Sequence, residues 1–289
     1  MKKILMLTDF SEASRNALCF ARAFFADTLA DFHLLTIYPA QTEGFNGLKH
    51  NAESARSAGA NQLHSIVTEL RQQATNDWHT FHSSALPGNL LDVVEQIVKA
   101  DGYDFVVIGL QQNGIYGLFG NGAVGLVHEL KANILVVPTD ALTKPIYQVV
   151  LAIDFASLKN SKLLSPLKEF VTLKGASLTL LSIETPGKQV IHPDQEIHIR
   201  QFLNPIKPTV AHLQAPTAKE GIDAYLMKHT VDLLVTIPRY KAMSSALPGY
   251  GNSHTQAYTP LVPLLTLYDD GSNDLPQLID DFSNVDLAL

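Results

Sequence analysis

The chain has 289 residues, of which 46% are hydrophobic and 17% charged, and its formal net charge is −7. This length and composition supply enough apolar side chains for one large domain or two of ordinary size, and they exclude a mainly disordered chain. The negative charge, without clustered lysine and arginine, argues against electrostatic binding to nucleic acid or an anionic membrane. With Cys19 as its one cysteine, the chain has neither an internal disulfide framework nor a cysteine-rich zinc site.

No apolar stretch approaches the ~18–20 residues that a transmembrane helix needs. The first residues, Met1-Lys2-Lys3, lead into a short strand-like segment rather than into a signal peptide. We therefore expect a soluble, cytoplasmic protein with neither a membrane nor a nucleic acid among its partners.

Short apolar segments alternate with helical segments along the whole chain. Strands are predicted at 4–10, 33–38, 103–108 and 134–138, and again at 149–155, 179–184, 231–236 and 264–267. Helices are predicted after residue 11, at 62–74 and 89–100, after residue 156, and at 194–203 and 218–229. Continuously apolar strands of this kind are typical of a mainly parallel sheet covered by helices on both faces.

The second half of the chain repeats the order of the first. Ile4-Leu5-Met6-Leu7-Thr8-Asp9-Phe10 has the same pattern as Val149-Val150-Leu151-Ala152-Ile153-Asp154-Phe155, and three further strand segments pair in the same order. Four paired segments indicate an internal duplication. The sequence therefore predicts an α/β protein of two doubly wound, mainly parallel-sheet domains, residues 1–143 and 144–269. The terminal strands, 134–137 and 264–267, are expected to pair. An acidic tail, 270–289, has five aspartates and neither lysine nor arginine.

Two features of the first half are expected at one crevice, because ligands of open parallel sheets bind beyond the carboxyl ends of the strands. Asp9 ends the first strand, and the glycine-rich stretch GLQQNGIYGLFGNG, residues 109–122, follows the strand at 103–108. A carboxylate there can accept hydrogen bonds from a ligand, and bare glycine backbone can approach phosphate oxygens. In the alternative interpretation, Asp9 caps the following helix and the glycines only turn the chain.

The glycine-rich stretch matches neither of the two best-known phosphate loops. It lacks the Gly-Lys-Ser/Thr ending of a P-loop, and no Gly-x-Gly-x-x-Gly follows the first strand. Two other patterns carry less weight. His192, Asp194, Glu196 and His198 enter a predicted helix that scatters them, so the chain has no metal-specific motif. Cys19 is expected to be a small core residue on the apolar face of the first helix.

Three segments, KKILMLTDFSEASRNAL at 2–18, ALPGNLLDVVEQIVKADGYDFVVIG at 85–109 and ILVVP at 134–138, resemble the universal stress protein family. The duplicated arrangement resembles its tandem, two-domain members. The resemblance implies a Rossmann-like, adenine nucleotide alpha hydrolase-like fold that serves stress response and regulation and commonly pairs through its last strands. Many members bind ATP, and others do not.

The family's ATP-binding residues map onto this sequence only in part. Asp9 matches the acid that contacts adenine, Ile37 the aliphatic contact to the base, and Gly109 the first loop glycine, whereas Gln112 stands where the second glycine is expected. Counting back from the strand at 134–137 places the third loop glycine and its neighbour at Gly120 and Asn121, in a loop two residues shorter than the family pattern. Asn121 replaces the hydroxyl residue, and its amide can still donate to phosphate.

The second half departs further from that pattern. Asp154 remains, but Ile237-Pro238-Arg239 occupies the start of the glycine loop, so this half is expected to have lost the site. The sequence thus predicts a cytoplasmic regulatory binding protein that holds ATP, ADP or AMP weakly in its first domain. The alternative is an interaction protein without nucleotide that acts through dimerisation or a partner. A slow ATP hydrolase ranks third, because no general base or Mg²⁺-binding acid is identified beside the loop.

Overall fold

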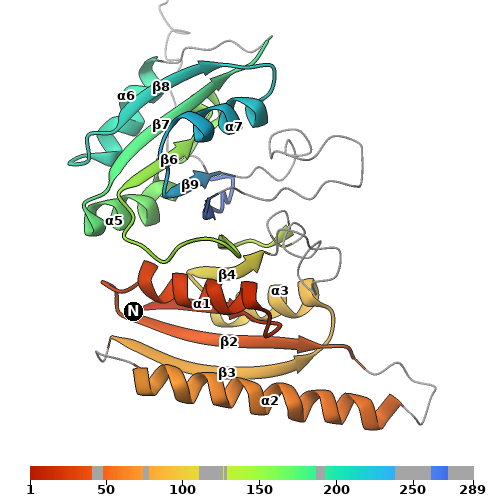
Figure 1. Cartoon of the computed structure of the whole chain (residues 1–289). Coiled ribbons are helices and arrows are strands. Elements are labelled where there is room, and N and C mark those ends of the chain that lie inside the picture. Colours follow the sequence, from red (N-terminus) through yellow and green to blue (C-terminus); the bar gives the residue numbers. More distant parts are fainter. Residues whose placement is uncertain are drawn as a thin grey trace, which may run out of the picture.

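A single twisted sheet runs through the protein (Figure 1). The computed structural model describes residues 1–40, 48–73, 78–110, 126, 129–186, 193–237 and 262–272, and within these residues the sheet has ten strands in the order β3-β2-β1-β4-β5-β10-β9-β6-β7-β8. The strands of the first half are β1 (Lys2–Leu7), β2 (Ala30–Tyr38), β3 (His79–Pro87), β4 (Phe105–Leu110) and β5 (Asn133–Pro138). Those of the second half are β6 (Gln148–Ala152), β7 (Ser177–Glu184), β8 (Thr209–Gln214), β9 (Leu233–Thr236) and β10 (Leu264–Thr266).

The two halves have the same strand order and meet at their last strands. All pairs within each half are parallel, whereas β5 and β10 pair antiparallel, with Leu265 opposite Leu135. The predicted contact between the terminal strands is thereby confirmed. An antiparallel junction between two parallel halves is the arrangement that a two-fold axis would give. The two halves of the chain are therefore arranged like the two subunits of a symmetric dimer.

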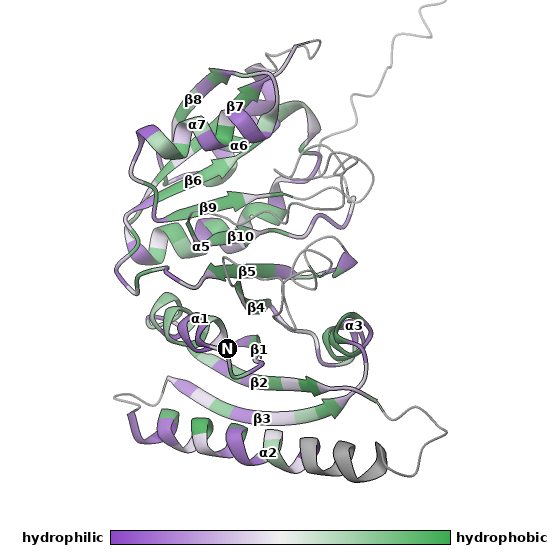
Figure 2. Cartoon of the chain, turned by 45° about the vertical axis from the view of Figure 1, so that its right-hand side comes forward, coloured by the Kyte–Doolittle hydropathy of each residue, from purple (hydrophilic) through white to green (hydrophobic). Residues whose placement is uncertain are grey.

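Helices cover both faces of the sheet (Figures 1 and 2). They are α1 (Glu12–Phe24), α2 (Leu48–Gln73), α3 (Leu90–Asp101), α5 (Ser165–Lys174), α6 (Pro193–Leu203) and α7 (Ala218–Lys228). Buried residues of α1, α2, α5 and α6 pack on one face, and those of α3 and α7 on the other. Strand residues alternate between these two cores, with Ile4 and Met6 in one and Leu5 and Leu7 in the other. This alternation explains why the strands are continuously apolar.

In each half, the aspartate just before the fourth strand accepts a backbone hydrogen bond at the start of the neighbouring first strand, β1 or β6. Asp104 Oδ2 accepts from Lys3 N at 2.8 Å, and Asp232 Oδ2 accepts from Tyr147 N and Gln148 N at 2.9 Å. Burial acts to raise the pKa of Asp232, but the ammonium of Lys144 at 2.6 Å and the two backbone donors outweigh it and lower the pKa. The repeated acid before each fourth strand therefore has a structural role.

The structure corrects three expectations. A fifth pair of strands, β3 and β8, forms the two edges of the sheet. After Asp154 the chain forms two short 3-10 helices, η1 (Phe155–Ser157) and η2 (Ser161–Leu164), instead of a continuous helix. Cys19 is exposed and not a core residue, because α1 buries the side that holds Ala17, Phe20, Ala21 and Phe24.

No helix among the described residues is long and apolar enough to cross a membrane.

Candidate functional site

The carboxyl end of β1 leads into a compact polar turn. Thr8 is buried, and its hydroxyl lies 3.1 Å from the hydroxyl of Ser14 and accepts from Phe10 N at 3.1 Å. Phe10 has φ of 65°, which is uncommon for a residue with a side chain. Ser11 then caps α1 by accepting from Ser14 N at 3.2 Å. The sequence folds this way because Thr8 and Ser11 supply side-chain acceptors for backbone N–H groups of a sharp strand-to-helix turn, while the Ser14 hydroxyl donates to Ser11 O at 3.0 Å.

Asp9 lies inside this turn, and its two carboxylate oxygens have different surroundings. Oδ1 accepts from Ser11 N at 3.0 Å, so the capping interpretation of Asp9 is correct for one oxygen. Oδ2 has no hydrogen-bond partner among the described residues. Asp9 is also only half-buried. One carboxylate oxygen is therefore available to a ligand at the carboxyl end of the sheet.

Ile37 lies on the neighbouring strand at the same end. Thr8 N donates to Leu35 O at 2.9 Å, which places the turn beside the last part of β2, two residues before Ile37. Ile37 packs, half-buried, with Leu86 and Leu90 on the face that α3 covers. Leu7 of β1 contributes to the same apolar cluster. The structure thus brings Asp9 and Ile37 to the ends of adjacent strands.

Gly109, the third described candidate, serves the packing of α1. A Cβ built on Gly109 would lie 2.3 Å from Ala13 O and 2.7 Å from Ser14 N, distances that real side chains do not reach. The bare backbone of β4 therefore lets the first turn of α1 approach the sheet closely. That turn contains the polar network around Asp9, so Gly109 determines how closely this network lies to β4. The remaining candidates, Gln112, Gly120 and Asn121, lie outside the described residues.

The second half has the same backbone position but a different surrounding. Ile153 N donates to Leu181 O at 2.9 Å, the equivalent of the bond from Thr8 to Leu35, so Asp154 corresponds to Asp9. Strand pairing aligns Phe105 with Ile4 and Leu233 with Val149, which makes Ile237 the counterpart of Gly109. The Ile237 side chain packs against the core cluster that contains Phe155 and Leu158.

The α-helix also begins later in the second half. α5 starts at Ser165, eleven residues after Asp154, whereas α1 starts at Glu12, three residues after Asp9. The second half therefore has only the short 3-10 helix η1 directly after its acid, and no α-helix begins there. The Asp154 carbonyl instead accepts from Ser157 N at 3.0 Å within η1.

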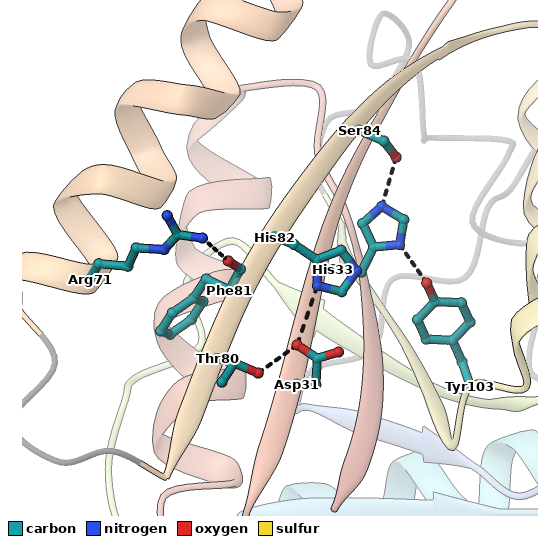
Figure 3. Close-up of polar contacts among 8 residues, drawn as sticks. All are labelled: Asp31, His33, Arg71, Thr80, Phe81, His82, Ser84 and Tyr103. Atoms are coloured by element: carbon teal, nitrogen blue, oxygen red, sulfur yellow. Dashed lines mark hydrogen bonds and ion pairs between the residues drawn. The ribbon is translucent and has the colours of Figure 1, made fainter.

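A second polar cluster, which sequence reasoning did not single out, lies nearer the amino ends of β2 and β3 (Figure 3). His33 lies between two hydroxyl groups: Nε2 is 2.7 Å from Ser84 Oγ, and Nδ1 is hydrogen-bonded to the Tyr103 hydroxyl. The ring of His82 stacks on that of His33 with centroids 4.3 Å apart, and its Nδ1 lies 3.2 Å from Asp31 Oδ1. Polar residues at alternate positions of HTFHSS, residues 79–84, were the available signal.

Burial dominates the electrostatics of this cluster. Loss of solvent around His33, together with repulsion from His82, lowers its pKa to about 4, against smaller opposing effects of Asp101 and Asp31. Burial and the same two acids raise the pKa of Tyr103 to about 12. His33 and Tyr103 are therefore neutral near pH 7 and act in this cluster as hydrogen-bonding groups. No group of three or more His, Cys, Asp or Glu side chains within the described part of the chain is arranged to hold a metal ion.

The fold defines a class of protein, a pair of doubly wound α/β units joined edge to edge. A model of the universal stress protein family matches residues 1–138. The match covers the first half of the chain, including Asp9, Ile37 and Gly109. No protein of curated function matches the sequence.

Solved structures show the same fold at low sequence identity. A universal stress protein from Archaeoglobus fulgidus DSM 4304 is 17% identical, with a TM-score of 0.67 over 92% of this chain and 97% of its own. A putative universal stress protein from Pseudomonas aeruginosa UCBPP-PA14 is 14% identical, with a TM-score of 0.57 over 92% and 93%. A universal stress protein family protein from Arabidopsis thaliana with AMP bound covers 49% of this chain and 94% of its own, with 15% identity and a TM-score of 0.37. The first two likenesses extend over both halves.

Proposed function

We propose that the chain is a regulatory binding protein of stress response, composed of two domains, 1–143 and 144–269, of which the first binds one adenine nucleotide. The proposal rests on the different hydrogen bonding of the two Asp9 carboxylate oxygens. One oxygen holds the turn through Ser11 N, and the other has no partner among the described residues. A carboxylate oxygen in this position accepts from an amino or hydroxyl group of a ligand.

The surroundings of Asp9 suit an adenine base. Ile37 offers an apolar, half-buried side chain on the adjacent strand, and the tight approach permitted by Gly109 brings the N-terminus of α1 to the same edge. A helix N-terminus favours a negative group such as phosphate. In the second half, Ile237 replaces that glycine and the helix begins later, which supports a single site per chain.

The sequence of the phosphate loop favours a short nucleotide. Gln112 places a side chain where the family uses bare backbone, and the loop that ends at Gly120 and Asn121 is two residues shorter than the family pattern. A shorter loop encloses fewer phosphates. We therefore expect weak binding, with AMP or ADP preferred to ATP.

Isothermal titration calorimetry of the full chain with AMP, ADP and ATP tests the proposal, using three matched variants. Asp9→Ala removes both carboxylate oxygens and should abolish detectable binding, because an unpaired buried partner costs ~1–3 kcal/mol, on the order of tenfold in affinity. Asp9→Asn keeps an acceptor for Ser11 N but turns a donor toward the ligand, so it should fold normally and also lose binding. Asp154→Ala should bind as the wild type does.

Two results would contradict the proposal. Two equivalent sites per chain, or loss of binding through Asp154→Ala alone, would show that the second half holds the nucleotide. No heat with any of the three nucleotides at millimolar concentration would favour the alternative class, an interaction protein without nucleotide.

A further inference from the structure

A groove with an apolar lining opens between the two halves, away from the crevice at Asp9. Its volume is about 1100 Å³, and its apolar lining consists of Leu29, Trp78, Leu173, Phe202 and Pro205. Leu29 and Trp78 directly precede β2 and β3, and Leu173 lies in α5. Phe202 lies in the last turn of α6, and Pro205 follows that helix. In Figures 1 and 2, α5 is the helix of the second half that faces α1 of the first.

The lining is unusually exposed for such large side chains. Leu29, Trp78 and Leu173 are 55%, 49% and 49% exposed and are among the few large hydrophobic residues exposed in the described part of the chain. Single exposed hydrophobic residues need no explanation, whereas these three lie together in the lining of one groove. The volume of about 1100 Å³ lies slightly above the range of ~300–1,000 Å³ that is typical of ligand pockets.

Charges around the groove decide what kind of ligand it suits. Both acids in the lining are already paired with lysines: Asp27 with Lys174 at 2.5 Å, and Glu169 with Lys2 at 2.8 Å. Lys168, which also lines the groove, has no acidic partner within the described residues. With the two pairs neutralised, the groove therefore presents one uncompensated positive charge.

The Lys168 ammonium is held in place but not saturated. It donates to Phe202 O at 2.7 Å and lies 5.2 Å from the centre of the Phe202 ring. An ammonium has three N–H donors, so two remain for a ligand. An apolar surface beside a positioned, unpaired cation is complementary to an apolar chain that ends in an anionic group.

We infer that this groove binds a free, single-chain amphipathic anion of the fatty-acid type, with its chain against Leu29, Trp78 and Leu173 and its head group at Lys168 Nζ. This site is independent of the proposed nucleotide site. Because the whole chain carries a net charge of −7, non-specific electrostatics favours cations. A preference for the anion therefore reports on the local charge of the groove.

The protein contains its own probe, since Trp78 is the one tryptophan of the chain and lines the groove. Tryptophan emission of the full-length protein is followed during titration with dodecanoate, and with dodecyltrimethylammonium as the matched cation, both below their micelle concentrations. We expect a saturable blue shift with dodecanoate and at least tenfold weaker binding of the cation. Equal or tighter binding of the cation, or no shift with dodecanoate, would overturn the inference.

Three variants separate the contributions of charge and apolar surface. Lys168→Gln should weaken dodecanoate binding at least threefold and reduce the preference over the cation, while Lys168→Arg should restore both. Leu173→Gln should weaken both ligands. The control Leu142→Gln replaces a leucine that is 73% exposed outside the groove and should change neither affinity. Circular dichroism checks that each variant is folded.

Two further outcomes count against the inference. Unchanged dodecanoate affinity in a folded Lys168→Gln variant would show that the head group does not lie at Lys168. A tryptophan shift with anionic phosphatidylglycerol vesicles, but not with monomeric dodecanoate, would show that the groove is a membrane-contact surface instead.

Discussion

At the scale of single residues, His33 shows how burial sets the chemistry of a polar group. The imidazole is 8% exposed, bonded on both nitrogens to hydroxyl groups and stacked on His82. A proton on this ring would be poorly solvated and close to a second imidazole. The lowered pKa of about 4 follows from those two causes, and it makes His33 a structural hydrogen-bonding residue at neutral pH.

The depressed pKa of His33 predicts a dependence of stability on pH. Since the folded value of about 4 lies below the ordinary value of 6.5, the unfolded chain binds more protons in that window. The free energy of unfolding should therefore fall as the pH falls from 6.5 toward 4, and His33→Gln should lessen this fall. Urea unfolding at pH 7.0 and 4.8 measures the effect, with His64→Gln on the exposed side of α2 as the control.

An equal loss of stability on acidification in wild type and His33→Gln would contradict this account of His33. A direct check is the NMR titration of the His33 ring, where His82→Ala should raise its pKa because a repelling neighbour is removed.

At the scale of elements, the close contact between α1 and β4 determines where the first turn of α1 lies. The first turn of the helix lies so close to Gly109 that a methyl group has no room beside Ala13 O. In the second half the equivalent residue is Ile237, and the helix begins eleven residues after the acid instead of three. The half with glycine at this position has an α-helix that begins beside the acid, and the half with isoleucine does not.

Gly109→Ala is predicted to displace the start of α1. Overpacking of this kind costs ~1–3 kcal/mol, which should lower the melting temperature by several degrees, and the shifted turn should weaken nucleotide binding. Gly59→Ala is a suitable control, because its Cβ meets only a Thr36 methyl at 3.3 Å. Thermal melting and calorimetry with AMP measure both effects. Melting and binding equal to those of Gly59→Ala would refute the role assigned to Gly109.

Elements with a strong hydrophobic pattern were predictable from the sequence, and those decided by position in the sheet were not. The inner strands β1, β2, β4 and β5 and their repeats show as apolar runs because both their faces are buried. The edge strands β3 and β8 have polar residues at alternate positions and escaped prediction. The late start of α5, at Ser165, was not predicted either.

For the candidate site, the positions of two residues could be predicted from the sequence, but their contacts could not. The position of Asp9 after a central parallel strand follows from topology, and so does the nearness of Ile37. The packing role of Gly109 could not be foreseen, because it depends on how closely α1 approaches β4. That Asp9 uses one oxygen for the turn and leaves the other also required the geometry.

At the scale of the whole molecule, contacts across the junction join the halves beyond the pairing of β5 and β10. Phe24 of α1 and Phe170 of α5 stack with centroids 4.2 Å apart and an angle of 7° between the rings. The ion pairs Lys174–Asp27 and Lys2–Glu169 flank this stack. Both acids are 55% exposed, so the pairs contribute little stability, and the aromatic stack is expected to carry more of the coupling.

A double-mutant cycle tests that expectation. Phe24→Ala and Phe170→Ala should each destabilise the protein, and the double variant should be more stable than the sum predicts, by a coupling of ~0.5–1.5 kcal/mol. Chemical unfolding of the full chain provides the four free energies. Strict additivity would show that the two rings do not couple the halves.

The central claim, one nucleotide site per chain at Asp9, is tested most directly by a crystal structure of the full chain grown with excess AMP. The account predicts density for one AMP, with the adenine beside Ile37 and an amino or hydroxyl group within hydrogen-bond distance of Asp9 Oδ2, and no ligand at Asp154. Density for AMP at Asp154, or none at Asp9 at a concentration that saturates the calorimetric signal, would contradict it.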